Sequence, residues 1–252
     1  LPEHFIADLP RDDESEARLD QFLGQHAEQI AGILVEPLVQ GAGGMVFHAE
    51  MCLARLRKLD DKHGVLLILD EIFTGFGRTG TMFAFETAEV APDIITLGKG
   101  LTGGTLPLAA TVATSKIFEA FWSDDPGHAL MHGPTYMGNA LACAAANASL
   151  DLFESEPRLL QSAEIAKKLT HGLGPCLGLP GVKDVRVRGA IGVVELERIG
   201  DMNRLKRRLV DAGVWVRPFR NIVYLTPALT IGDADLATLT SAIHSVLHAN
   251  RP

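Results

Sequence analysis

Two polar residues, each at the end of an apolar run, are of types that can do chemistry together. Lys99 follows the run Ile94-Ile-Thr-Leu97 and has a glycine on each side. Asp70 follows the run Val65-Leu-Leu-Ile-Leu69. A protein supplies two such groups to pyridoxal phosphate: a lysine that forms a Schiff base and an aspartate that pairs with the pyridinium nitrogen. The pair therefore points to that cofactor.

Each residue also has an ordinary structural interpretation. Lys99 fits a surface turn, although the glycines of Leu97-Gly-Lys-Gly-Leu-Thr-Gly-Gly104 let a flat ligand approach the backbone. The apolar run before Lys99 predicts an apolar setting for its amine. Asp70 fits a helix cap or a turn at the end of a strand. A magnesium-binding role for Asp70 is set aside, because no Gly-x-x-x-x-Gly-Lys-[Ser/Thr] segment precedes it.

Three further residues are candidates for binding anionic groups. Thr135, in His132-Gly-Pro-Thr-Tyr-Met-Gly-Asn139, precedes an Ala-rich helical pattern, so it is expected to cap that helix, to bind a phosphate there, or both. Arg78 and Arg217 fit ordinary surface or ion-pairing roles, but the guanidinium fork also matches a substrate carboxylate. Arg217 is the better candidate because it ends an apolar strand predicted over Val214–Val216 and precedes a proline.

Apolar patterns place these residues on an α/β scaffold. Short apolar runs that alternate with a helical pattern indicate a mostly parallel sheet, and such sheets bind ligands at the carboxyl ends of their strands. Asp70 and Lys99 are therefore expected to meet at one edge of the sheet. Gly64 is expected to end the intervening helix. The expected strands are 33–39, 65–69, 93–97 and 106–114, and the expected helices are one ending near 30 and one over 49–63.

The C-terminal part of the chain predicts a smaller α+β domain. An Ala-rich helix over 139–154 leads into it, so the chain is divided into a large cofactor-binding domain, residues 1–150, and a small domain, residues 151–252. The elements expected in the small domain are helices over 156–173, 202–212 and 233–248 and strands over 182–187, 191–196, 214–216 and 222–225.

Composition narrows the classes of function. The chain has 252 residues and a net charge of −8 without a block of basic residues, which disfavours nucleic-acid binding. Its three cysteines lack metal-ligand spacing, so we expect reduced thiols in the cytoplasm and no metal site. No apolar run approaches the ~20 residues that span a bilayer, so no membrane association is expected. The first residues show no secretory signal, and the chain does not begin with Met.

Several segments together resemble the class III pyridoxal-phosphate aminotransferases of fold type I. The resemblance spans nearly the whole chain and rests on independent motifs in the right order. Within that family, His132–Asn139 together with Gly189-Ala-Ile-Gly-Val-Val194 and Gly213-Val-Trp-Val-Arg-Pro-Phe219 resembles the branch that moves an amino group from S-adenosylmethionine to 8-amino-7-oxononanoate in biotin biosynthesis. The remaining motifs are Glu36-Pro-Leu-Val-Gln-Gly-Ala-Gly-Gly-Met45, Asp70-Glu-Ile-Phe-Thr-Gly-Phe-Gly-Arg-Thr-Gly80 and Leu97–Gly104.

The resemblance implies cofactor-binding roles residue by residue. It makes Lys99 the Schiff-base lysine and Asp70 the partner of the pyridinium nitrogen. Pro134 and Thr135 would bind the cofactor phosphate across the interface of a homodimer. Glu36 would lie near the cofactor ring.

The resemblance also implies substrate-binding roles. Gly133 would line the substrate site, and Arg217 would bind the carboxylate of 8-amino-7-oxononanoate and, in the other half-reaction, of S-adenosylmethionine. Tyr224 and Arg78 match positions near the substrate. The alternatives are another class III aminotransferase, acting on an ω-amino acid, ornithine or a diamine, and, within the same branch, lysine as the amino donor.

One departure from the family concerns what precedes Leu1. The family's upstream third, with a Gly-Ser phosphate turn, an aromatic residue stacked on the ring and tryptophans of the substrate pocket, has no counterpart in this sequence. Residues 1–150 are then the remainder of the large domain, and a truncated, non-catalytic chain is a further alternative. A second departure is Phe73, a bulky residue in the turn expected beside the cofactor.

Overall fold

The computed structural model describes residues 4–249 and divides into two compact units. Residues 1–3, on which the expectation about a signal sequence rests in part, lie outside the described range. Two internal segments, Gln40–Val46 and Gly75–Met82, belong to the same unit as the C-terminal residues. The single domain boundary at residue 150 therefore stays a prediction. The first unit comprises Leu1–Val39, Phe47–Thr74 and Phe83–Asp151, and the second comprises Gln40–Val46, Gly75–Met82 and Leu152–Pro252.

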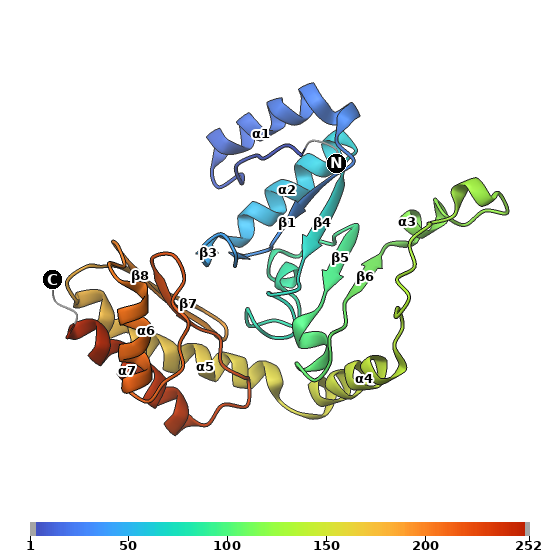
Figure 1. The fold of residues 1–252 in the computed structure, drawn as a ribbon. Helices are drawn as coiled ribbons and strands as arrows, with labels where there is room; N and C mark the ends of the chain where they lie inside the picture. Colours follow the sequence, from blue (N-terminus) through green and yellow to red (C-terminus); the bar gives the residue numbers. More distant parts are fainter. Residues whose placement is uncertain (1–3, 250–252) are drawn as a thin grey trace. The chain divides into compact units, whose positions relative to one another are not determined.

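A four-stranded sheet forms the centre of the first unit (Figure 1). Its order is β1-β4-β5-β6; the first three strands are parallel, and β6 pairs with β5 in the antiparallel direction. The mostly parallel sheet predicted from the apolar runs is therefore confirmed. The strands are β1 (Gly32–Val35), β4 (Leu66–Asp70), β5 (Ile94–Leu97) and β6 (Ala110–Ala113).

Two helices, α1 (Asp13–His26) and α2 (Glu50–His63), complete the N-terminal half of this unit; α2 contacts β4, and α1 contacts α2. Asp12 caps α1 by accepting a hydrogen bond from the Ser15 amide at 2.8 Å, and the Ser15 hydroxyl accepts one from the Asp12 amide in return. Gly64 ends α2 with a φ of 68°, a left-handed conformation that glycine adopts without strain, as predicted.

The other elements of the first unit are short, apart from α4 (Ala140–Ser155), which continues into the second unit. Hydroxyl Oγ of Ser149 on α4 donates to the carbonyl oxygen of Gly100 at 3.2 Å, so this helix supports the turn that carries Lys99. The short elements are η1 (Ala27–Gln29), β2 (Val39–Gln40), β3 (Val46–Phe47), η2 (Ala84–Ala88), η3 (Lys99–Thr102), α3 (Ser115–Glu119) and η4 (Pro126–His128).

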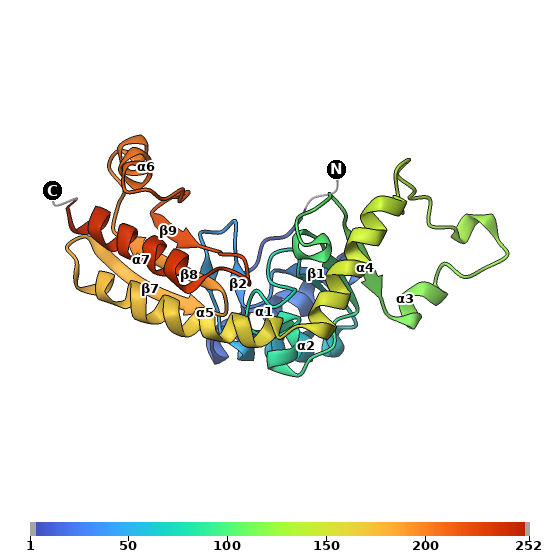
Figure 2. The same cartoon turned by 90° about the horizontal axis from the view of Figure 1, so that it is seen from below.

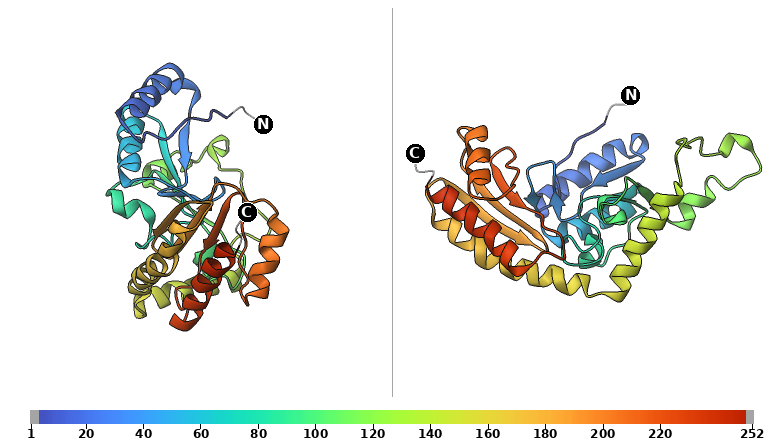
Figure 3. Two further views of the ribbon diagram at one scale, coloured as in Figure 1. Left: turned by 90° about the vertical axis from the view of Figure 1, so that its left-hand side faces the viewer. Right: turned by 60° about the horizontal axis from the view of Figure 1, so that its bottom comes forward.

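A three-stranded antiparallel sheet, β7-β8-β9, organises the second unit. Helices α5 and α7 lie side by side, and α5 packs on β7 and β8 (Figures 2 and 3). Leu169, Val194 and Ile243 are among the fully buried residues of the core between these layers. The elements are α5 (Arg158–Leu173), η5 (Gly174–Gly178), β7 (Val182–Arg188), β8 (Ile191–Leu196), α6 (Met202–Asp211), β9 (Ile222–Leu225) and α7 (Asp233–His248).

The strand predicted over 214–216 does not form. Val214 and Val216 are buried in the core of the second unit, whereas Trp215 is 88% exposed, so the alternating pattern reflects packing. Within residues 4–249 this segment is paired with no strand, and the backbone bridge that follows it joins Phe219 and Ile222. The alternating apolar pattern therefore predicted strand pairing that this segment does not make.

None of the helices within residues 4–249 combines the length and the hydropathy that crossing a bilayer requires.

Candidate functional site

Asp70 and Lys99 lie at the carboxyl ends of two neighbouring parallel strands, as the sequence predicts. Asp70 is the last residue of β4 and is paired with Thr96 of β5. The Glu71 amide donates to the Thr96 carbonyl oxygen at 3.0 Å, which continues the ladder past the end of β4. Lys99 follows β5 after Gly98. The two chemical groups therefore share one edge of the sheet.

Lys99 has an unusual backbone conformation. Its φ is 45°, in the left-handed region that non-glycine residues seldom adopt, and it begins the short helix η3. Strain of this kind costs on the order of 1–3 kcal/mol and is concentrated at ligand-binding and catalytic positions. The conformation therefore supports a functional interpretation of Lys99 over an ordinary surface turn.

The setting of the Lys99 amine differs from the apolar environment predicted for it. Lys99 is exposed within the described part of the chain. Its Nζ atom lies 5.0 Å from the centre of the Phe73 ring, close enough for a cation–π contact. Phe73, noted above only as a departure from the family pattern, is thus a neighbour of the amine. The prediction failed because an apolar run before a residue reports on the strand, and the side chain of Lys99 lies beyond its end.

Asp70 has its carboxylate held through one oxygen. Oδ1 accepts a hydrogen bond from the Ile72 amide at 3.0 Å and another from the Thr96 hydroxyl at 3.2 Å. Within the described residues, Oδ2 accepts none and remains for a further donor. Asp70 caps no helix; the bond from Ile72 makes it a strand-end turn residue, so that ordinary interpretation holds beside the functional one. A half-buried carboxylate with one open oxygen fits the protonated nitrogen of a pyridine ring.

Glu71, which the sequence analysis did not single out, is fully buried. Its carboxylate accepts hydrogen bonds from the Thr74 hydroxyl at 2.7 Å and from the amides of Ala84 and Phe85 at 2.9 and 3.0 Å. Burial raises the pKa of Glu71, and the three donors oppose that rise. Through these hydrogen bonds Glu71 connects Thr74, at the start of the segment 74–84, to Ala84 at its end. The only sequence signal for a role of Glu71 was its position as a second carboxylate directly after a buried strand.

Glu36 lies at the same sheet edge. It directly follows β1, the strand next to β4, and is half-buried. The ring of His48 makes a hydrogen bond of 3.1 Å to the Glu36 carbonyl oxygen, which positions this part of the backbone. The structure therefore brings Glu36, Asp70 and Lys99 to the ends of three adjacent parallel strands.

The segment between β6 and α4 extends away from the sheet (Figure 3). Gly133, Pro134 and Thr135 belong to this segment and are exposed. A β-carbon added at Gly133 would meet no atom within 4 Å. Thr135 does not cap α4: the Asn139 carboxamide oxygen accepts the Ala142 amide at 3.1 Å, and the helix begins at residue 140. The capping interpretation of Thr135 is wrong, because four residues separate it from the first turn.

Arg78 belongs to the second unit and is anchored there by backbone contacts. Its guanidinium donates to the carbonyl oxygens of Ala190 at 3.1 Å and Pro227 at 2.7 Å. Gly189 fits closely beneath it; a β-carbon there would lie 2.5 Å from the Arg78 carbonyl oxygen. Burial lowers the pKa of Arg78. No carboxylate of the described residues forms an ion pair with this guanidinium, so its charge is available to an anion.

Arg217 and Tyr224 also belong to the second unit. Arg217 is exposed, in the irregular segment between α6 and the Phe219 bridge. Tyr224 is half-buried on β9, opposite Val193 of β8. These two residues and Arg78 therefore belong to a different unit from the strand ends that carry Asp70 and Lys99.

Among residues 4–249, no group of three or more His, Cys, Asp or Glu side chains is arranged to hold a metal ion. The three cysteines are unpaired thiols.

The chain is similar to known proteins over most of its length. The family profile described as aminotransferase class-III matches residues 5–247. The chain is 47% identical over 244 residues to an adenosylmethionine-8-amino-7-oxononanoate aminotransferase of Mycobacterium leprae, covering 96% of this chain and 56% of the relative. It is 43% identical over 255 residues to the protein of that name from Buchnera aphidicola subsp. Acyrthosiphon pisum, covering 98% of this chain and 59% of the relative.

Solved structures show the same fold. The crystal structure of adenosylmethionine-8-amino-7-oxononanoate aminotransferase from Methanocaldococcus jannaschii superposes with a TM-score of 0.86 at 33% identity, covering 95% of this chain and 58% of that one. An amine transaminase from an uncultivated Pseudomonas species, in its PLP-bound form, gives a TM-score of 0.85 at 35% identity with the same coverage.

The chain spans less than two thirds of the length of these curated relatives. What the longer proteins act on is therefore carried to this chain only as a proposal.

Proposed function

Because this chain belongs to the class III aminotransferases, we propose that it is part of a pyridoxal-phosphate-dependent enzyme that moves an amino group from S-adenosylmethionine to 8-amino-7-oxononanoate, giving 7,8-diaminononanoate for biotin biosynthesis. The observation that carries the proposal is the pair of groups at the carboxyl ends of β4 and β5: an amine on a strained residue, Lys99, and a carboxylate with one open oxygen, Asp70.

The residues at the strand ends fit this cofactor. Lys99 Nζ would be the amine that holds the cofactor, and Asp70 Oδ2 would accept a hydrogen bond from its ring N–H. When bound, pyridoxal phosphate supplies an electron sink for the carbon that carries the transferred amino group. The negative charge of Asp70 would keep the ring nitrogen protonated, and the Ile72 amide fixes one oxygen of that carboxylate.

Lys99 also has a proton-transfer role. Its Nζ accepts the proton of the carbon that carries the transferred amino group and returns a proton when the nitrogen has moved. The Phe73 ring, 5.0 Å from Nζ, limits the directions in which the amine can turn. Glu36, at the end of the neighbouring strand, lies near the cofactor ring.

Two arginine side chains bind the carboxylate groups of the substrates. Arg217 binds the carboxylate of either substrate through its guanidinium fork, and Arg78, which has no carboxylate partner among the described residues, provides a second positive charge near the substrate. Tyr224 and Gly133 line the substrate site.

Assembly as a homodimer follows from the family resemblance. Pro134 and Thr135 would then bind the cofactor phosphate of the partner subunit, which agrees with their exposure in this chain. The three unpaired thiols support a location in the cytoplasm.

The first experiment is a visible absorption spectrum of the purified protein with pyridoxal phosphate, before and after addition of S-adenosylmethionine. We expect a band for the cofactor attached to Lys99, its loss on addition of the donor, and its absence in Lys99→Ala. Multiple turnovers by Lys99→Ala would contradict the assignment. A band that responds to lysine, ornithine or a diamine, and not to S-adenosylmethionine, would keep the cofactor and change the donor.

The same spectrum, recorded on proteins of two lengths, separates the enzyme from a non-catalytic chain. If residues 1–252 show no band whereas the protein expressed from its complete coding sequence does, the described residues require the remaining part of the protein to retain the cofactor.

A further inference from the structure

Thr96 is a polar residue at the strand ends, beside Asp70. It is half-buried on β5, one residue before Leu97, and its hydroxyl donates to Asp70 Oδ1 at 3.2 Å. A carboxylate is a pure acceptor, so the threonine hydroxyl must be the donor in this contact.

The sheet fixes Thr96 beside Asp70. The two residues are register partners in the parallel pair β4–β5, and side chains of paired residues point to the same face of a sheet. The hydrogen bond from the Glu71 amide to the Thr96 carbonyl oxygen locks that register directly at the site. Threonine is branched at Cβ, which restricts its χ1 angle and keeps the hydroxyl in a defined position.

Two donors from different segments meet at one oxygen of Asp70. The Ile72 amide approaches Oδ1 from the turn after β4, and the Thr96 hydroxyl approaches it from the neighbouring strand. A single donor leaves the carboxylate able to rotate about its Cβ–Cγ bond, whereas two donors on one oxygen occupy both of its lone pairs. The orientation of Asp70 thus depends on the hydroxyl as well as on the backbone.

We infer that Thr96 is a positioning residue for the cofactor: its hydroxyl holds the Asp70 carboxylate so that Oδ2 accepts the ring N–H of pyridoxal phosphate. This inference rests on the proposed function. It predicts that loss of the hydroxyl weakens binding only of ligands that carry a ring N–H.

The test uses Thr96→Val in the protein expressed from its complete coding sequence. Dissociation constants are measured by fluorescence titration for pyridoxal phosphate and for its analogue with carbon in place of the ring nitrogen. Thr96→Val is expected to weaken binding of pyridoxal phosphate about tenfold, the effect of one hydrogen bond to a charged group. Binding of the analogue is expected to change less than about twofold, because it has no N–H for Asp70 to accept.

Two variants serve as controls. Thr96→Ser keeps the hydroxyl and is expected to bind pyridoxal phosphate within about twofold of the wild type. Thr111→Val makes the same substitution on β6, at the exposed position paired with Thr96, and is expected to bind both ligands as the wild type does. If Thr96→Val does not fold, Thr96→Ala replaces it in the same comparison.

The outcomes separate this inference from the proposed function. Equal losses for both ligands in Thr96→Val, or no loss for either, overturn the positioning role while the cofactor assignment stands. A loss in Thr96→Ser as large as that in Thr96→Val also overturns it, because the hydroxyl is then not the cause. A wild-type protein that binds no pyridoxal phosphate overturns the proposed function, and this inference with it.

Discussion

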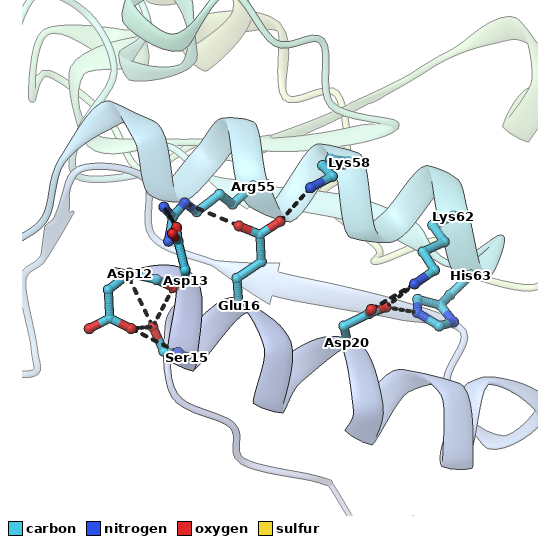
Figure 4. Close-up of polar contacts among 9 residues, drawn as sticks. All are labelled: Asp12, Asp13, Ser15, Glu16, Asp20, Arg55, Lys58, Lys62 and His63. Carbon is cyan, nitrogen blue, oxygen red and sulfur yellow. Dashed lines mark hydrogen bonds and ion pairs between the residues drawn. The ribbon is translucent and has the colours of Figure 1, made fainter.

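Carboxylates at the end of β4 and along α1 have opposite surroundings within the same unit. Asp70 and Glu71 are bound by backbone amides and hydroxyls and pair with no cation among the described residues. On α1, Asp13, Glu16 and Asp20 instead face the basic side chains of α2 (Figure 4). The carboxylates after β4 are therefore fixed in orientation by backbone and hydroxyl donors, whereas the carboxylates of α1 are bound mainly by long, flexible side chains.

A row of ion pairs, here called the α1–α2 ladder, joins Asp13, Glu16 and Asp20 of α1 to Arg55, Lys58, Lys62 and His63 of α2. Lys58 contacts Glu16 at 2.7 Å, and Asp20 contacts both Lys62 and His63 at 2.6 Å. The hydrogen bonds from Lys62 and His63 lower the pKa of Asp20. The two lysine pairs are exposed, and such pairs gain little net free energy, because water screens them and the side chains lose freedom. The comparison shows that a short distance to a charged partner does not by itself fix the direction of a carboxylate, whereas donors on the backbone and on short side chains do.

Asp60 on α2 is a third case that belongs to neither region. It is fully buried, and neither of its oxygens has a hydrogen-bond partner in the described part of the chain. Burial raises its pKa to about 7, with Asp93 and Asp61 adding to the rise and Arg57 opposing it. Asp60 is therefore a carboxylate with the burial of Glu71 but without its donors.

The largest effect expected from this comparison is on activity. Asp70→Asn removes the negative charge at the strand end while keeping the shape of the side chain, so steady-state transamination should fall about 100-fold or more. Asp20→Asn, the matched change on α1, should leave kcat within about twofold, because its partners Lys62 and His63 belong to α2 and not to the strand ends. Similar losses in both variants would mean that the site is not at the ends of β4 and β5.

A second prediction concerns pH and Asp60. Its folded-state pKa is raised from 3.8 to about 7, so the folded state holds the proton more tightly and stability falls as pH rises from about 4 to about 7. Asp60→Asn removes this loss. The free energy of unfolding of the variant, relative to wild type, should rise across that range by on the order of 4 kcal/mol, which is the linkage value for this rise in pKa.

Urea unfolding at several pH values measures this difference. Asp61→Asn is the control, since Asp61 is the adjacent residue on the exposed side of α2 and pairs with Arg57 at 2.7 Å. A difference between Asp60→Asn and wild type that is constant with pH would show that Asp60 is charged in the folded protein.

A third prediction addresses Glu71. Glu71→Gln places an amide group among three donors, so at least one buried donor loses its acceptor, at a cost of about 1–3 kcal/mol. The melting temperature and the rate of proteolysis within residues 74–84 should both report this loss. Unchanged stability and unchanged proteolysis would mean that the carboxylate does not hold the ends of this segment together.

The smallest effect is expected on α1 and α2. Lys62→Ala removes one partner of Asp20 but leaves His63, so the melting temperature should change by no more than about 2 °C, and less at 1 M salt than at low salt. A large, salt-independent shift would show that this ladder stabilises the unit as the strand-end donors do.

Much of the fold was predictable because its signals are local. The apolar runs before Asp70 and Lys99 indicated the buried strands, and Gly64 marked the end of α2. Three predictions were wrong: an apolar setting for Lys99, Thr135 as the cap of α4, and a strand over Val214–Val216. Each of these features depends on which neighbouring segment is present and not on the local residues.

The sequence by itself determined the elements and the types of chemical group at their ends, because periodicity, glycine signals and motifs are properties of short segments. Only the tertiary structure decided that Thr96 donates to Asp70, that Glu71 collects its amides from Ala84 and Phe85, and that Asp60 is buried without a donor among the described residues. These facts depend on strand register and on how segments distant in the sequence pack, which no local pattern records.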